Sequence, residues 1–115
     1  MTTVVIAAGA PQVARILEHK LRREGHDVLC VHDANAMRNA LTEREVDVLI
    51  TDVSLRPVLD TTSPRAGWLL MVDSLDPPES AHAAMRDGAA GIVRLPFKPT
   101  AVAAQVATLM SLATA

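Results

Sequence analysis

Aromatic residues are nearly absent from this chain of 115 residues, which contains one Phe, one Trp and no Tyr. Half of its residues are nevertheless hydrophobic, so Val, Leu, Ile, Met and Ala must fill any core. A chain of this length is expected to form one domain, here residues 1–115, and to bury well over half of its unfolded surface. The composition therefore predicts a single globular domain with an aliphatic core.

Cysteine, net charge and long apolar runs are also scarce. The single cysteine, Cys30, excludes an internal disulfide and is typical of a reducing cytoplasm. A net charge of −2 argues against the basic face that nucleic-acid binders usually show. No apolar run is long enough to span a bilayer, and the start, MTTVVIAAGAP, lacks the features of a signal peptide. We expect a cytoplasmic protein that binds neither nucleic acid nor membrane.

Short apolar runs alternate with segments of helical spacing along the chain. The runs that predict strands are TVVIA (3–7), DVLCV (27–31), VDVLIT (46–51), WLLMV (68–72) and GIVRL (91–95). The segments with apolar residues at helical spacing are 11–24, 34–44, 77–87 and 99–113. Continuous apolar strands are covered on both faces, which is typical of a parallel sheet. Strands that alternate with helices predict a doubly wound α/β domain.

Prolines and a capping pair mark where the helices should begin. Pro11, Pro77 and Pro99 stand where a first helical turn needs no N–H donor. Asp76 with Glu79 predicts an N-cap acceptor and its partner at the start of the third helical segment.

One connection lacks a helical pattern. Residues 53–67, VSLRPVLDTTSPRAG, contain two prolines and a glycine and show no apolar stripe. We expect a loop or a short turn there, where a full helix would otherwise cross from one strand to the next.

A carboxylate ends the third predicted strand. The unbroken apolar run Val48, Leu49 and Ile50 is followed by Thr51 and then Asp52. In doubly wound folds, ligands and chemistry gather at the carboxyl ends of the strands, which is where Asp52 stands. A solvated strand-end carboxylate, or a cap of the following loop, explains Asp52 equally well.

The order and spacing of these segments resemble the receiver domain of two-component response regulators over nearly the whole chain. AGIVRLPFKPTAVAAQVATL matches the family's last strand and helix without gaps. VDVLITDVSL matches the strand that ends in the phosphoacceptor, which falls on Asp52, and LEHKLRREGHDVLCVHDANAM matches the segment from the first helix to the second. The resemblance implies a flavodoxin-like fold of five parallel strands in the order 2-1-3-4-5, here with the third helix shortened or replaced by a loop.

The acidic pair that holds Mg²⁺ in the family has no counterpart in this sequence. The matching place after the first strand reads IAAGAPQ, where Ala7 and Ala8 offer no carboxylate. Mg²⁺ normally takes one or two carboxylates among its oxygen ligands, so Asp52 alone predicts a poor site. We expect no metal and no other cofactor.

Other functional positions of the family are also altered. Its Thr or Ser at the end of the fourth strand aligns with Asp73, and Ser74 follows. Its Lys, which neutralises the phosphoryl group, aligns with Leu95 before Pro96, and its aromatic switch aligns with Ile92. The resemblance also implies a cis bond between Leu95 and Pro96. Because phosphoryl transfer depends on positioned charge, these changes predict a receiver that signals without phosphorylation.

The alignment places Asp73 across adjacent strands from Asp52. Two such carboxylates about 6 Å apart would repel by roughly 1–3 kcal/mol. A close pair of this kind can share a proton, so we expect that the site could respond to pH, to a ligand or to a partner.

The last helical segment, PTAVAAQVATLMSLATA, contains no charged residue. Its core stripe includes Val102, Val106, Leu109 and Ala113. Receiver domains often pair through this region, so the resemblance implies a homodimer or a contact with another signalling protein. The candidate contact residues are Val102, Gln105, Val106, Leu109 and Met110.

Together these features predict an atypical, non-enzymatic receiver domain that acts by protein–protein contact in bacterial signal transduction. Two alternatives remain open. One is a conventional response regulator that is phosphorylated on Asp52. The other is a small nucleotide- or ligand-binding module, because AAGAPQ is a small-residue turn before a helix and could admit an anion at the helix N-terminus.

Overall fold

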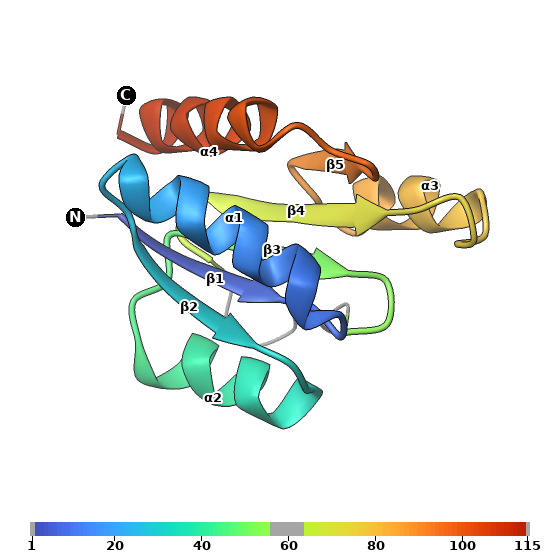
Figure 1. Cartoon of the computed structure of the whole chain (residues 1–115), viewed down its shortest axis with the longest axis horizontal. Coiled ribbons are helices and arrows are strands. Elements are labelled where there is room, and N and C mark those ends of the chain that lie inside the picture. The colour runs from blue at the N-terminus through green and yellow to red at the C-terminus, as the bar shows by residue number, and fades with distance from the viewer. Residues whose placement is uncertain (1, 56–63, 115) are drawn as a thin grey trace.

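A parallel sheet forms the centre of the molecule (Figure 1). The computed structural model describes residues 2–55 and 64–114. In these residues the strands are β1 (Thr3–Ala7), β2 (Asp27–Val31), β3 (Val48–Asp52), β4 (Gly67–Val72) and β5 (Gly91–Arg94), and the helices are α1 (Pro11–Arg23), α2 (Ala34–Glu43), α3 (Glu79–Arg86) and α4 (Pro99–Thr114). The strands hydrogen-bond in the order β2-β1-β3-β4-β5, all parallel, which confirms the predicted doubly wound topology.

Alternate residues of each strand supply the two faces of the core. One cluster joins Ile6, Ile50 and Met71 to side chains from α1 and α4. The other joins Leu49 and Leu70 to side chains from α2 and α3. Figure 1 shows the same arrangement, with α1 and α4 on one side of the sheet and α2 on the other. The strands read as continuous apolar runs because both faces are covered.

Two predicted helix starts are confirmed and one is wrong. Pro11 and Pro99 are the first residues of α1 and α4. The predicted cap at Asp76 does not form, because α3 begins at Glu79 after Pro78, which already has helical dihedral angles and no side-chain cap. Asp76 instead accepts a hydrogen bond from the backbone N–H of Asp73 at 2.9 Å. The loop before α3 therefore uses this carboxylate, and the helix does not.

The connection between β3 and β4 lies partly outside the described residues. Residues 53–55 form a turn, and residues 64–66 approach β4 without a helix. The prediction of a shortened or missing third helix is consistent with these ends, and its remainder falls on residues 56–63, which the structure does not describe.

A buried carboxylate fastens the opposite edge of the sheet, where the strands begin. Asp47 is 6% exposed, and its Oδ2 accepts a hydrogen bond from the backbone N–H of Thr3 at 2.8 Å. The Asp47 carbonyl accepts from Ala66 N–H at 2.7 Å, and the Arg65 guanidinium lies 3.8 Å from its Oδ1. Asp47 thus ties the first residue of β1 to the chain entering β4.

The described helices give no sign of a membrane span: none is both long enough and apolar enough to cross a bilayer.

Candidate functional site

Asp52 ends β3 at the carboxyl edge of the sheet, and its carboxylate accepts hydrogen bonds from three donors within residues 2–55 and 64–114. Oδ1 accepts hydrogen bonds from the Ser54 hydroxyl at 2.9 Å and from Leu55 N–H at 2.8 Å. Oδ2 accepts from Gly9 N–H at 2.8 Å. The first two bonds cap the turn that follows β3, as the simpler explanation of this residue predicts. The third fastens the loop between β1 and α1 to β3.

The residues facing Asp52 differ from those that the sequence indicated. Ala7 and Ala8 are buried and pack in the two core clusters, on opposite faces of the sheet. Gly9 faces the carboxylate instead, because a Cβ built on it would lie 3.6 Å from both Asp52 Oδ2 and Ser54 Oγ. The sequence reasoning missed Gly9 and Ser54 as partners of Asp52. A serine two residues after an aspartate was the only local signal for this arrangement.

Asp73 follows β4 and organises its own loop. Its Oδ1 accepts hydrogen bonds from Leu75 N–H at 2.7 Å and from Asp76 N–H at 3.1 Å. Ser74 is exposed beside it. The bonds of Asp73 and those of Asp52 go to different loops, so proton sharing between the two carboxylates stays a prediction.

Where β5 ends, an aliphatic side chain stands at the position for which the resemblance implies a lysine. Leu95 is half-buried, its N–H donates to the Val72 carbonyl at 2.8 Å, and its bond to Pro96 is cis, as predicted. Ile92, at the switch position, packs partly buried against the cluster on the α2 and α3 side. Lys98 is exposed beyond the proline. The side chain at the lysine position of the resemblance is therefore aliphatic.

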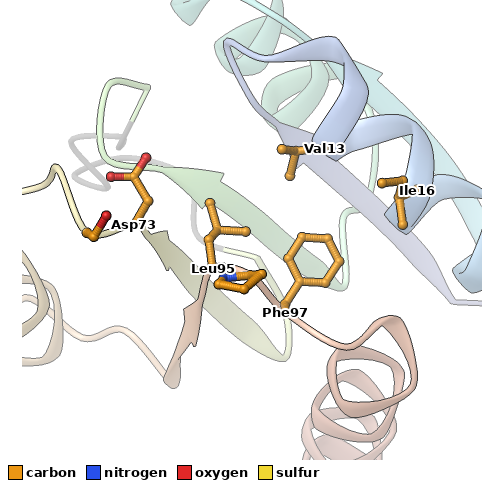
Figure 2. A pocket seen from close by; sticks show the side chains of 7 residues that line it. Val13, Ile16, Asp73, Leu95 and Phe97 are labelled. Atoms are coloured by element: carbon orange, nitrogen blue, oxygen red, sulfur yellow. The ribbon is translucent and has the colours of Figure 1, made fainter.

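A groove, here called the α1–β5 groove, opens beside these residues (Figure 2). Its volume is about 420 Å³. It is lined by Val13, Ile16, Asp73, Ser74, Leu95, Pro96 and Phe97. The lining joins α1, the loop after β4 and the segment after β5, which are far apart in the sequence, and most of it is apolar.

The structure corrects the predicted contact surface of α4. Val102 and Val106 are 1% and 0% exposed and belong to the core, so the prediction that they contact a partner is wrong. Gln105 is half-buried, and its Nε2 donates to the Ile92 carbonyl at 3.4 Å. Leu109 and Met110 are partly buried against the same core. Among the residues of the helix whose burial the structure describes, the exposed ones are Thr100, Ala101, Ala104, Ala107, Thr108, Ser111, Leu112 and Ala113.

Cys30, on β2, is half-buried beneath α1. Burial raises the pKa of this thiol from 9.0 to about 11, and the nearby negative charge of Glu18 adds to the rise. The cysteine is therefore a neutral core thiol at physiological pH, which agrees with a structural role.

The described residues contain no group of three or more His, Cys, Asp and Glu side chains that could hold a metal ion. At the carboxyl edge the described residues include the carboxylates Asp52 and Asp73, and each already accepts hydrogen bonds from N–H or O–H donors. This donor-rich surrounding does not fit Mg²⁺, which needs further oxygen ligands rather than donors.

No protein-family model matches the chain. Solved structures of receiver domains do resemble it over almost its whole length. The chemotaxis response regulator CheY4 of Vibrio cholerae matches at a TM-score of 0.75 and 19% identity, covering 95% of this chain and 98% of that one. A signal receiver domain from Bermanella marisrubri matches at a TM-score of 0.82 and 17% identity, and the match covers 96% of this chain and 99% of that one. NtrX from Brucella abortus matches at 0.86 and 18%, covering 99% of this chain but 27% of that one.

These similarities establish the fold. The chain has the flavodoxin-like receiver fold of response regulators, with the strand order that the sequence predicted. Identities below one fifth leave the activity to be argued from the site itself.

Proposed function

We propose that this protein is an atypical receiver that transmits signals by contact with other proteins, without phosphorylation of Asp52. The observation that carries the proposal is the state of the Asp52 carboxylate. Its two oxygens accept from Gly9, Ser54 and Leu55, which makes Asp52 a connector of two loops. A phosphoacceptor oxygen must instead be free to attack phosphorus while cations neutralise the developing charge.

The surroundings of Asp52 supply little of that charge. Leu95 is aliphatic at the position where the resemblance implies a lysine, and Gly9 has no side chain where a second carboxylate would help to hold Mg²⁺. Asp73 brings a further negative charge to the same edge of the sheet. Each change opposes the transfer of a phosphoryl group, because that group is itself strongly anionic.

The direct test is incubation with acetyl phosphate and Mg²⁺, followed by intact mass measurement. We expect no mass increase in the wild-type chain under conditions that phosphorylate a conventional receiver in a parallel reaction. A gain of one phosphoryl group that disappears in Asp52→Asn would show a conventional phosphoacceptor and would refute the proposal.

We also propose that the exposed face of α4 takes part in these contacts, with a homodimer as the simplest case. The face consists mainly of Ala, Thr and Ser, whose side chains lose little conformational entropy on packing. Leu112, which is 70% exposed, is its largest apolar residue. Sedimentation analysis should show a dimer that Leu112→Glu weakens. A wild-type chain that stays monomeric at high concentration would contradict the homodimer.

A further inference from the structure

The α1–β5 groove combines hydrocarbon walls with a carboxylate at one end. Val13 and Ile16 come from α1, and Leu95 and Phe97 come from the segment after β5. Figure 2 shows Asp73 on one side of Leu95, with Phe97 and the two α1 side chains on the other. Among the described residues that line the groove, Asp73 alone carries a charge. The groove is therefore apolar along its length and anionic at one end.

One oxygen of the Asp73 carboxylate accepts no hydrogen bond from the part of the chain that the structure describes. Its Oδ1 already accepts from Leu75 N–H and Asp76 N–H, and these bonds hold the side chain in place. Its Oδ2 has no hydrogen-bond partner within residues 2–55 and 64–114. A carboxylate whose orientation is fixed by one oxygen can bind a donor through the other without losing much further entropy.

The walls also leave apolar surface for a ligand to cover. Ile16 is 54% exposed, although it lies on a helix that packs against the sheet. Leu95 and Phe97 are half-buried on the facing side. Covering such surface is favourable in proportion to the apolar area removed from water.

We propose that this groove binds a small amphipathic cation, with an apolar body and a single ammonium or guanidinium group. The body lies against Ile16, Leu95 and Phe97, and the cation donates to Asp73 Oδ2. The groove volume of about 420 Å³ falls within the range of small-molecule sites. A purely polar cation would gain nothing from the walls, and an apolar anion would be repelled by Asp73. The inference rests on the groove alone and is independent of the phosphorylation state of Asp52.

Tryptamine is a suitable probe, and indole-3-propionate is its matched anion. We expect tryptamine, titrated into the ¹⁵N-labelled full chain, to shift the amide resonances of Val13, Ile16 and Phe97 in a saturable way. A ligand of this size should bind with a dissociation constant on the order of 1 mM. Indole-3-propionate should bind about tenfold more weakly, because attraction to Asp73 becomes repulsion.

Three variants separate this site from unspecific binding. Asp73→Asn removes the charge but keeps an oxygen that can accept from the N–H groups of Leu75 and Asp76. This variant should weaken the binding of tryptamine about three- to fivefold. Asp27→Asn removes an exposed charge at the other edge of the sheet and should leave the affinity unchanged. Ile16→Ala shortens a half-exposed wall, which the fold tolerates, and should also weaken binding.

Several results would overturn the inference. These are the absence of saturable shifts at concentrations about tenfold above the expected constant, equal affinity for the indole anion, and equal effects of Asp73→Asn and Asp27→Asn. Shifts confined to residues outside the groove would overturn it as well. Should Asp73→Asn disturb the loop after β4, the comparison of the two indoles and the Ile16→Ala variant decide the question without it.

Discussion

Replacing Asp52 by alanine tests whether this carboxylate stabilises the fold or is kept for chemistry. The change removes the acceptor of three hydrogen bonds, from Gly9 N–H, the Ser54 hydroxyl and Leu55 N–H. Each bond to a charged acceptor contributes about 1.5–3 kcal/mol when its loss leaves a buried group unpaired. Asp52 is half-buried, and Gly9 and Ser54 are exposed, so water will replace much of the hydrogen bonding that the substitution removes.

We therefore expect Asp52→Ala to lower the free energy of unfolding by about 1–2 kcal/mol. For a chain of this size the midpoint of thermal unfolding should fall by about 4–10 °C. Urea denaturation monitored by circular dichroism measures the first quantity, and a thermal scan measures the second. Asp27→Ala is the matched control, because Asp27 is exposed at the start of β2, and its loss should change stability by less than about 0.5 kcal/mol.

Whether Asp52→Ala lowers or raises the free energy of unfolding distinguishes a structural carboxylate from a reactive one. A carboxylate held among other negative charges for the sake of a reaction is a source of strain, and its removal stabilises the protein. A variant as stable as the wild type, or more stable, would therefore refute the view that Asp52 connects two loops. A double-mutant cycle with Ser54→Ala should give a coupling energy of about 0.5–1 kcal/mol, since the two side chains are bonded directly.

Three further predictions concern the core and the sheet edge. Asp47→Ala should cost about 2–3 kcal/mol in urea denaturation, because it leaves the N–H of Thr3 without its acceptor, and no loss would contradict the tie between β1 and β4. Val106→Ala should lower the free energy of unfolding by about 2 kcal/mol, because Val106 is buried, whereas Ala104→Ser at an exposed position should be nearly neutral. Equal effects of the two substitutions would contradict the burial of Val106. The pKa of Cys30 is raised to about 11 when folded and is 9.0 otherwise, so its stabilising contribution is complete below pH 9 and is lost as pH rises toward 11. Iodoacetamide should accordingly modify Cys30 slowly at pH 8 and faster near pH 11, and rapid modification at pH 8 in the folded chain would contradict the shift.

The topology could be predicted from the sequence because burial on both faces leaves a plain signal in each strand. The run VVI in β1 and the run VLI in β3 are apolar without alternation, which is typical of strands in a parallel sheet covered on both faces. The first strand was bounded correctly. The third began two residues later than predicted, because Asp47 turns its carboxylate toward Thr3 before the ladder begins.

The site was harder to predict because its decisive contacts join residues that are distant in the sequence. Gly9 and Asp52 are 43 positions apart, and a glycine carries no side chain that would reveal its role. Asp76 failed as a helix cap because Asp73, three residues earlier, offers a competing N–H donor. The α1–β5 groove is assembled from three separate segments, so no single stretch of sequence indicates it.

The backbone at Gly9 leaves this edge of the sheet open to redesign. Gly9 does not have a positive φ angle, and a side chain grown from it would meet its nearest neighbours only at ordinary van der Waals distance. A Cβ fits there without moving the chain, so Gly9 is the position at which to introduce a carboxylate, and a lysine at Leu95 would supply the second missing charge. Gly9→Asp combined with Leu95→Lys would therefore ask whether charge alone makes this edge accept a phosphoryl group, provided that the free energy of unfolding is measured for the same variant.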